Sequence, residues 1–237
     1  MVNPKEASMI VIVTGMHRSG TSAMAGFLHL NGIKMGRKQD FHPRPNGENK
    51  KGFYENKAFR NVNDKWLANG INGNKYHVKR WKEDPIRLYD KNPTKADLEP
   101  AHKMISIFEA DFQKSKDVKG WGWKDPRTCL TLSWWLEALK GKDVRIVIMN
   151  RDLEAIGRSL RKRNNCSIER GVELARQYHK ICAEHLSKYP HVPYTWVSFD
   201  LLIKQPGHIE RRLSSFLGCD INSKAAVKFL DPKLKHW

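Results

Sequence analysis

An apolar run, a glycine-rich loop and a helix that follow one another constrain this chain more than any other feature. Residues 9–15, MIVIVTG, are uncharged and mostly β-branched, which is typical of a strand buried in a parallel sheet. Four residues separate Gly15 from Gly20, and apolar side chains then recur at helical spacing over residues 21–32. A strand, loop and helix joined in this way direct backbone N–H groups and the positive end of a helix at one point. The sequence therefore predicts an oxyanion site at this loop.

The loop lacks the lysine that a nucleoside-triphosphate loop carries. In such a loop a lysine stands directly before the Ser or Thr and reaches the β- and γ-phosphates. Here Thr21 and Ser22 follow the second glycine, and we expect one of them to cap the helix. The nearest cation is Arg18, whose guanidinium can bind two oxygens at once. No acid is clearly placed for Mg²⁺, although Asp200 at a strand end could imitate one, so we expect binding of a sulfuryl-type group without a metal.

Strand-like and helix-like segments alternate along the rest of the chain. Short apolar or β-branched runs predict strands in GWGWK before Pro126, at residues 144–150 and at residues 194–200. Periodicity and end signals predict helices at residues 55–68, after Pro93, beyond Asp152, at residues 168–188 and at residues 206–217, with Gly218 as the C-cap. Polar or irregular composition predicts loops at residues 37–52 and 70–92. This alternation predicts an α/β three-layer sandwich around a mostly parallel sheet, P-loop NTPase-like, in a single domain over residues 1–237.

Composition limits the class of protein. An apolar content of 40% favours a folded globule, and the net charge of +18 favours anionic partners, with a generally solvated basic surface as the alternative. The four cysteines lie at least 16 residues apart and have no metal-binding spacing, which is typical of reduced thiols in a cytosolic protein. No signal peptide or membrane-spanning run is visible, so we expect a cytoplasmic protein.

The loop GMHRSGTS resembles the 5′-phosphosulfate-binding loop of sulfotransferases that use 3′-phosphoadenosine 5′-phosphosulfate (PAPS). Residues 18–21 match that family's (Lys/Arg)-Ser-Gly-Thr pattern, whereas His17 replaces its usual proline. The resemblance implies the sulfotransferase fold and PAPS as the cofactor, with no metal required. It also implies a set of cofactor-binding residues at this loop: Gly15, His17, Arg18, Ser19, Gly20, Thr21 and Ser22.

A second motif strengthens the resemblance. The family binds the 3′-phosphate of PAPS with an arginine after an apolar strand and a serine eight residues later, and VIMNRDLEAIGRSL supplies Arg151 and Ser159 at that spacing. Ser159 lies about 10 Å along the predicted helix, so both reach one phosphate only if Arg151 folds back along it. Alternatively, Arg151 is an arginine on the surface, and Ser159 is a helix serine whose hydroxyl is hydrogen-bonded to a preceding backbone carbonyl.

Three more segments resemble the family and imply catalytic residues. KKGFYENKAF is similar to a region that supplies a glutamate base, here Glu55, and GWGWKDPR to a segment whose lysine, here Lys124, lies near the transferred group. The segment SFDLLIKQPGHIERRLSSFLG is similar to the family's C-terminal region. Because the RKG…GDW signature of the cytosolic small-molecule branch is absent, the carbohydrate, tyrosyl-protein and bacterial branches fit better.

The implied reaction is in-line transfer of a sulfuryl group from PAPS to an acceptor hydroxyl. Glu55 would accept the hydroxyl proton, while Arg18 and Lys124 would stabilise charge on the transferred group. The alternative for Glu55 is an ordinary glutamate in the first turn of a helix, where the helix dipole stabilises it. The alternative for Lys124 is a salt bridge with Asp125 or another acid. Arg127 is a weaker candidate for orienting the site. The next candidates for the base are His17, Asp125 and His42. The nearby Trp121 and Trp123 pack either on adenine or acceptor rings or in the core.

Two other functions compete with this interpretation. A P-loop nucleoside or nucleotide kinase would share the strand, loop and helix but would need ATP and Mg²⁺. A basic nucleic-acid-binding protein would use the positive charge, but the basic residues are dispersed, so no nucleic-acid partner is expected. We expect a hydroxyl-bearing acceptor held by residues 37–54 and 70–92. The Lys, Arg and aromatic content of these segments suits a glycan or an acidic molecule, and a peptide tyrosine and a lipid head group are the alternatives. The sequence does not indicate the oligomeric state.

Overall fold

The structure, a computed structural model, describes residues 9–41, 54–69, 91–115, 118–222 and 224. These residues form a five-stranded sheet in the order β2-β3-β1-β4-β5, in which every neighbouring pair is parallel. The strands are β1 (Ile10–Gly15), β2 (Ile33–Lys34), β3 (Gly120–Lys124), β4 (Val144–Asn150) and β5 (Tyr194–Ser198). The predicted α/β class with a central parallel sheet is confirmed.

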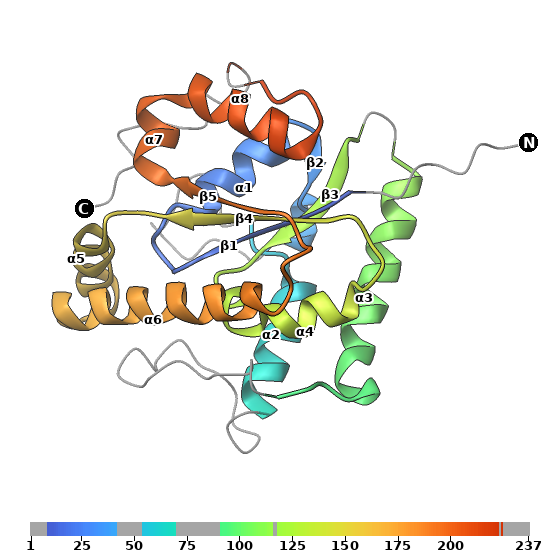
Figure 1. Cartoon of the computed structure of the whole chain (residues 1–237), viewed down its shortest axis with the longest axis horizontal. Helices are drawn as coiled ribbons and strands as arrows, with labels where there is room; N and C mark the ends of the chain where they lie inside the picture. Colours follow the sequence, from blue (N-terminus) through green and yellow to red (C-terminus); the bar gives the residue numbers. More distant parts are fainter. Residues whose placement is uncertain (1–8, 42–53, 70–90, 116–117, 223, 225–237) are drawn as a thin grey trace, which may run out of the picture.

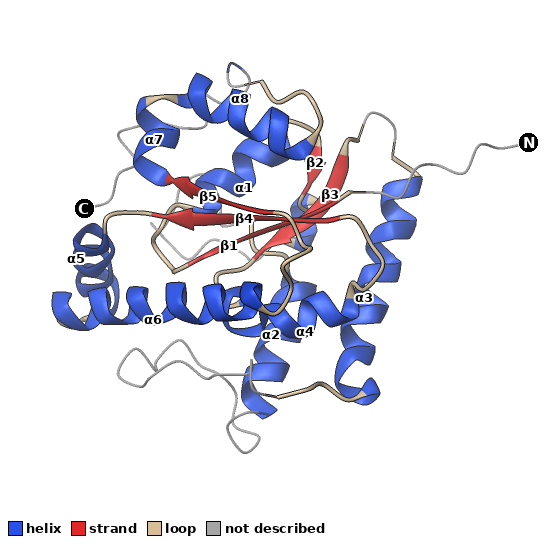
Figure 2. Ribbon diagram, viewed as in Figure 1, coloured by secondary structure: helices blue, strands red, loops and turns tan. Residues whose placement is uncertain are grey.

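Helices cover both faces of the sheet (Figure 1). One layer contains α1 (Thr21–Leu30), α7 (Phe199–Lys204) and α8 (Pro206–Leu217), and it packs on Val11 and Val13 of β1. The other contains α2 (Lys57–Asn69), α3 (Lys95–Gln113), α4 (Thr128–Ala138), α5 (Leu153–Asn164) and α6 (Ile168–Ser187), and it packs on Ile10 and Ile12. Successive residues of β1 thus enter opposite apolar clusters, as the two-residue period of a strand requires. Figure 2 shows the resulting three layers.

The predicted site residues follow the carboxyl ends of the central strands. The sheet register places Val13 of β1 opposite Lys124 of β3, and Gly15 of β1 opposite Met149 of β4. Arg151 follows directly after β4. Because all these strands are parallel, their carboxyl ends lie at one edge of the sheet, where open α/β folds bind their ligands.

Several local predictions were wrong. The last strand ends at Ser198 rather than at residue 200, because the Ser198 side chain accepts a hydrogen bond from the Leu201 N–H and starts α7. Neither Thr21 nor Ser22 caps α1, whose N-cap is Gly20 in a left-handed conformation without a side-chain cap. The helix predicted from residue 55 begins at Lys57.

Strand β2 and helices α4 and α7 were not predicted from the sequence. Strand β2 has two residues, too few for alternation to show. Every residue of α4 except Glu137 is buried, so the helix has no polar face and no amphipathic period. A short 3₁₀ helix, η1 (Lys38–Asp40), follows β2 within the predicted loop. The remainder of the two predicted loops, residues 42–52 and 70–90, lies outside the described residues, as does His42. None of the helices that the structure describes is long and apolar enough to cross a membrane.

Candidate active site

The glycine-rich loop after β1 is a tight turn fixed by its own contacts. Gly15 has φ +135°, and a Cβ there would lie 2.4 Å from the Met149 carbonyl oxygen. Gly20 has φ +93°, and a Cβ there would lie 2.2 Å from the Phe199 ring. The Ser19 hydroxyl donates a hydrogen bond to the Met16 carbonyl at 2.6 Å. Side chains at either glycine would therefore clash, and the loop leads directly into the N-terminus of α1, where backbone N–H groups lack helical partners.

Arg18 joins the loop to α5. Its Nε donates to the Ser159 hydroxyl at 2.7 Å, and its carbonyl accepts a hydrogen bond from Arg151 Nη1 at 3.3 Å. Arg18 has φ +70°, a conformation that costs a non-glycine residue about 1–3 kcal/mol and persists only where the surrounding structure fixes it. The two motifs that lie more than 130 residues apart in sequence therefore meet in the fold. Ser159 and Arg151 therefore both lie beside the glycine-rich loop, because each of them contacts Arg18.

Arg151 is a buried cation that forms no ion pair with the carboxylates of the described residues. It is 7% exposed, and its Nε has no hydrogen-bond partner in the structure. No carboxylate among the described residues forms an ion pair with it, and its guanidinium lies 5.1 Å above the Phe199 ring centre. Burial lowers the pKa of Arg151, against the opposing effect of Asp200. Because a buried charge is costly unless it is paired, these contacts fit an anionic group beside Arg151.

Glu55 lies between two buried cations. Its Oε1 accepts a hydrogen bond from Lys124 Nζ at 2.9 Å, and its Oε2 lies 3.9 Å from Arg127 Nη2. Burial acts to raise the pKa of Glu55, but Lys124 and Arg127 outweigh it and lower the pKa to about 2. The structure therefore brings the predicted base and the predicted lysine together. The salt bridge considered for Lys124 also exists, with Glu55 as its acid.

Arg127 is held by a network that the sequence analysis did not identify. Its guanidinium lies 3.3 Å from Asp125 Oδ2 and 3.2 Å from Asp64 Oδ1. The Asn63 amide donates to Asp125 Oδ2 at 2.9 Å, and the Asn63 carbonyl oxygen accepts from Trp135 Nε1 at 2.8 Å. Burial acts to lower the pKa of Arg127, but its three acidic neighbours raise it overall. Sequence periodicity could place Asn63 and Asp64 on α2, but it gave no sign that they turn toward β3.

Two other base candidates have different surroundings. Asp125 is fully buried, and its carboxylate accepts hydrogen bonds from both Asn63 and Arg127, so it is engaged within the protein. His17 is buried beside this cluster, with its ring edge-on to Tyr178 at 6.1 Å. Burial, followed by the charge of Arg127, lowers the pKa of His17 well below its usual value. His17 is therefore neutral at neutral pH.

The two tryptophans on β3 belong to the core. Trp123 stacks on Phe59 with ring centres 4.4 Å apart and planes 6° apart, and its Nε1 donates to the Thr128 hydroxyl. Trp121 is 1% exposed and packs near Phe108 and Phe59. Both side chains are therefore buried, as the alternative interpretation, in which they pack in the core, predicts.

The comparisons with known proteins find similar structures but no matching sequence. No protein-family model matches the chain, and no curated protein matches it. The sulfotransferase domain of the Synechococcus PCC 7002 olefin synthase is similar at a TM-score of 0.53 and 14% identity, over 98% of this chain and 88% of that one. Sulfotransferase STF9 from Mycobacterium avium is similar at a TM-score of 0.51 and 11% identity, over 94% of this chain and 66% of that one.

These neighbours and the described topology agree on the architecture. The match to the olefin synthase domain covers nearly the whole of both chains, and it includes the parallel five-stranded sheet of this chain. The chain therefore has the fold of the sulfotransferases.

Proposed function

We propose that this protein transfers a sulfuryl group from PAPS to an acceptor hydroxyl. The observation that carries the proposal is Arg151, a buried guanidinium that is hydrogen-bonded to the carbonyl of Arg18 and has no ion pair among the described residues. The Arg18 side chain reaches Ser159, so two cations and one hydroxyl converge at the N-terminus of α1. This set matches the two phosphate-containing ends of PAPS, and the sulfotransferase fold supports the same assignment.

The residues that would hold PAPS are those of the loop and of α5. The backbone N–H groups of residues 15–22 and the Arg18 guanidinium would bind the 5′-phosphosulfate, and Arg151 and Ser159 would bind the 3′-phosphate. PAPS would supply the sulfuryl group, whose bond to the phosphate oxygen breaks as a bond to the acceptor oxygen forms. We infer that this chemistry needs no metal ion, because Arg18 and Lys124 supply positive charge beside the loop.

Glu55 would accept the proton from the acceptor hydroxyl. A carboxylate with a pKa of about 2 is a weak base, and Lys124 and Arg127 are what lower it. The role therefore requires Lys124 to release Glu55 when the acceptor hydroxyl is bound, which raises the pKa of the carboxylate. Arg127 would stay in place, since Asp125 and Asp64 hold its guanidinium. In this proposal Lys124 controls when Glu55 becomes basic.

We further propose that the acceptor is a glycan or another anionic biomolecule and that the protein acts in the cytoplasm. The net charge of +18 supports an anionic acceptor through long-range attraction. The wide spacing of the four cysteines, all of which are free, supports a reducing compartment.

A thermal-shift experiment tests the proposed function against its alternatives. The product 3′-phosphoadenosine 5′-phosphate (PAP), ATP with Mg²⁺, and an oligonucleotide would each be added to the whole protein. We expect PAP to raise the Tm in the presence of EDTA and the other two to raise it less, because a ligand that binds only the folded state stabilises it. Arg151→Ala should reduce the shift, whereas Arg158→Ala, which changes an exposed residue of α5, should retain it. A larger shift with ATP and Mg²⁺ or with the oligonucleotide would contradict the proposal.

A further inference from the structure

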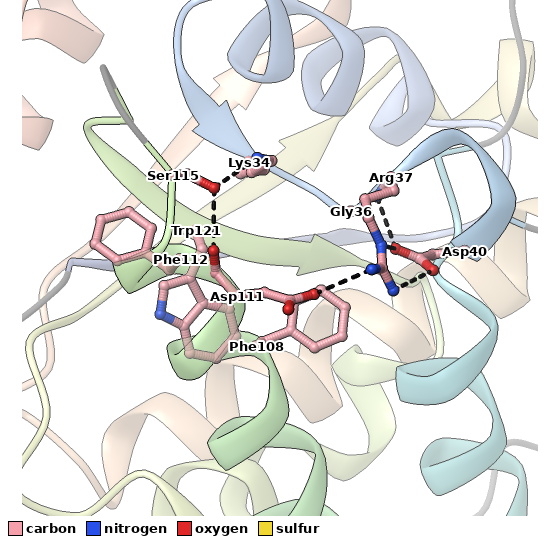
Figure 3. Close-up of a pocket in the computed structure, with 9 residues that line it drawn as sticks. All are labelled: Lys34, Gly36, Arg37, Asp40, Phe108, Asp111, Phe112, Ser115 and Trp121. Atoms are coloured by element: carbon pink, nitrogen blue, oxygen red, sulfur yellow. Dashed lines mark hydrogen bonds and ion pairs between the residues drawn. The ribbon is translucent and has the colours of Figure 1, made fainter.

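A cavity of about 200 Å³ lies away from the candidate active site, between α3, the edge strand β2 and η1 (Figure 3). None of its described lining residues belongs to the glycine-rich loop, to α5 or to the Glu55 cluster. Phe59 of α2 packs against both Phe108 at the cavity and Trp123, which precedes Lys124. Aromatic packing therefore separates this cavity from the predicted catalytic residues.

Aromatic rings form the inner wall of the cavity. Phe108 and Phe112 project from the C-terminal half of α3, and Trp121 comes from β3 (Figure 3). The Phe108 and Trp121 ring centres lie 5.8 Å apart with planes inclined by 33°. Such a wall favours a flat aromatic ligand, because offset and edge-on ring contacts add to the gain from burying apolar area.

The charged groups at the cavity differ in how well they are neutralised. Arg37 Nε donates to Asp40 Oδ2 at 3.0 Å, and Arg37 Nη1 lies 3.5 Å from Asp111 Oδ2, so two acids balance this cation. The Arg37–Asp111 pair also joins η1 to α3 across the cavity (Figure 3). Lys34 forms no ion pair with any carboxylate that the structure describes. The formal charges of the lining residues therefore sum to zero, and Lys34 is the lining cation that has no paired acid among the described residues.

Lys34 is fixed in position at one end of the cavity. Its Nζ donates to the Ser115 hydroxyl at 2.8 Å, and that hydroxyl donates in turn to the Asp111 carbonyl at 3.0 Å. An ammonium group has three N–H donors, and this contact uses one of them. The remaining donors suit an anionic oxygen beside the aromatic wall.

We propose that this cavity binds a small aromatic carboxylate. The ring would pack against Phe108, Phe112 and Trp121, and the carboxylate would pair with Lys34. A volume of about 200 Å³ is below the range of about 300–1,000 Å³ typical of sites for drug-sized ligands, which favours one ring or two fused rings over a nucleotide. The proposal does not rest on the proposed function, because it uses none of the residues assigned to PAPS.

Calorimetry with indole-3-acetate as the probe tests this proposal on the whole protein. We expect tenfold weaker binding of tryptophol, which lacks the carboxylate, and of cyclohexylacetate, which lacks the aromatic ring. Lys34→Gln should weaken indole-3-acetate binding at least tenfold, and Lys34→Arg, which keeps the charge, should restore most of it. Lys38→Gln is the matched control, because Lys38 is an exposed lysine of η1 that does not line the cavity.

Two results would overturn the proposal. Equal affinity of the Lys34→Gln and wild-type proteins for indole-3-acetate would show that the probe binds elsewhere. Displacement of the probe by PAP would place it in the nucleotide site. If the probe binds independently of PAP and depends on Lys34, the cavity is a second site, whether or not the protein proves to be a sulfotransferase.

Discussion

The position of Glu55 between two buried cations predicts how stability depends on pH. The folded-state pKa of Glu55 is lowered from 4.5 to about 2, so the unfolded chain binds this proton more readily than the folded one. The ionised carboxylate therefore stabilises the fold above pH 4.5, and that stabilisation is lost as the pH falls through about 2. The difference between the two pKa values corresponds to about 3 kcal/mol at neutral pH.

Glu55→Gln removes this charge while keeping the shape of the side chain. We expect it to lower the free energy of unfolding by about 3 kcal/mol at pH 7 and by about 2 kcal/mol at pH 3.5, where the unfolded glutamate is mostly protonated. Urea unfolding followed by circular dichroism at both pH values measures the difference. Glu154→Gln is the matched control, because Glu154 pairs with Arg158 at 2.8 Å on the surface, where ion pairs contribute about 0–1 kcal/mol. A loss in the free energy of unfolding that is no larger for Glu55→Gln than for Glu154→Gln at pH 7 would refute this prediction.

Two further predictions concern the loop and the chemistry. Gly20→Ala should lower the free energy of unfolding by about 1–3 kcal/mol, because φ is +93° and the new Cβ meets the Phe199 ring; an unchanged urea midpoint would contradict this. Once an acceptor is identified, Glu55→Gln should lower turnover by about 10²–10⁴ and leave PAP affinity within about threefold. Arg18→Ala should lower both turnover and affinity, so matched losses of PAP affinity in the two variants would argue against separate roles.

The architecture could be predicted because its strands carry strong local signals. Uncharged β-branched runs at β1 and β4 and the glycine-rich turn are visible in the sequence, and parallel strands carry the loops that follow them to one edge of the sheet. The pairing of Arg151 with Ser159 at one site was predictable only through the resemblance to a family, and the contact between Arg18 and Ser159 was not predicted. The spacing of Arg151 and Ser159 allowed that arrangement without requiring it.

Other features depend on tertiary contacts that local patterns do not report. Helix α4 is buried on nearly all sides, so it lacks the polar face that reveals a surface helix. Asn63 and Asp64 act on Arg127 only because α2 packs beside α4 and β3. The lowered pKa of Glu55 likewise arises from Lys124, 69 residues away.

The most direct test of the account is a calorimetric comparison of PAP with adenosine 5′-phosphate in the absence of metal. The two nucleotides differ in the 3′-phosphate, the group assigned to Arg151 and Ser159. We expect PAP to bind more tightly, and Arg151→Ala to weaken PAP binding by about 1.5–3 kcal/mol, the range for a hydrogen bond to a charged group. Arg151→Ala should leave the affinity for adenosine 5′-phosphate nearly unchanged. Equal affinities of the wild-type protein for the two nucleotides would contradict the assignment of Arg151 and the account built on it.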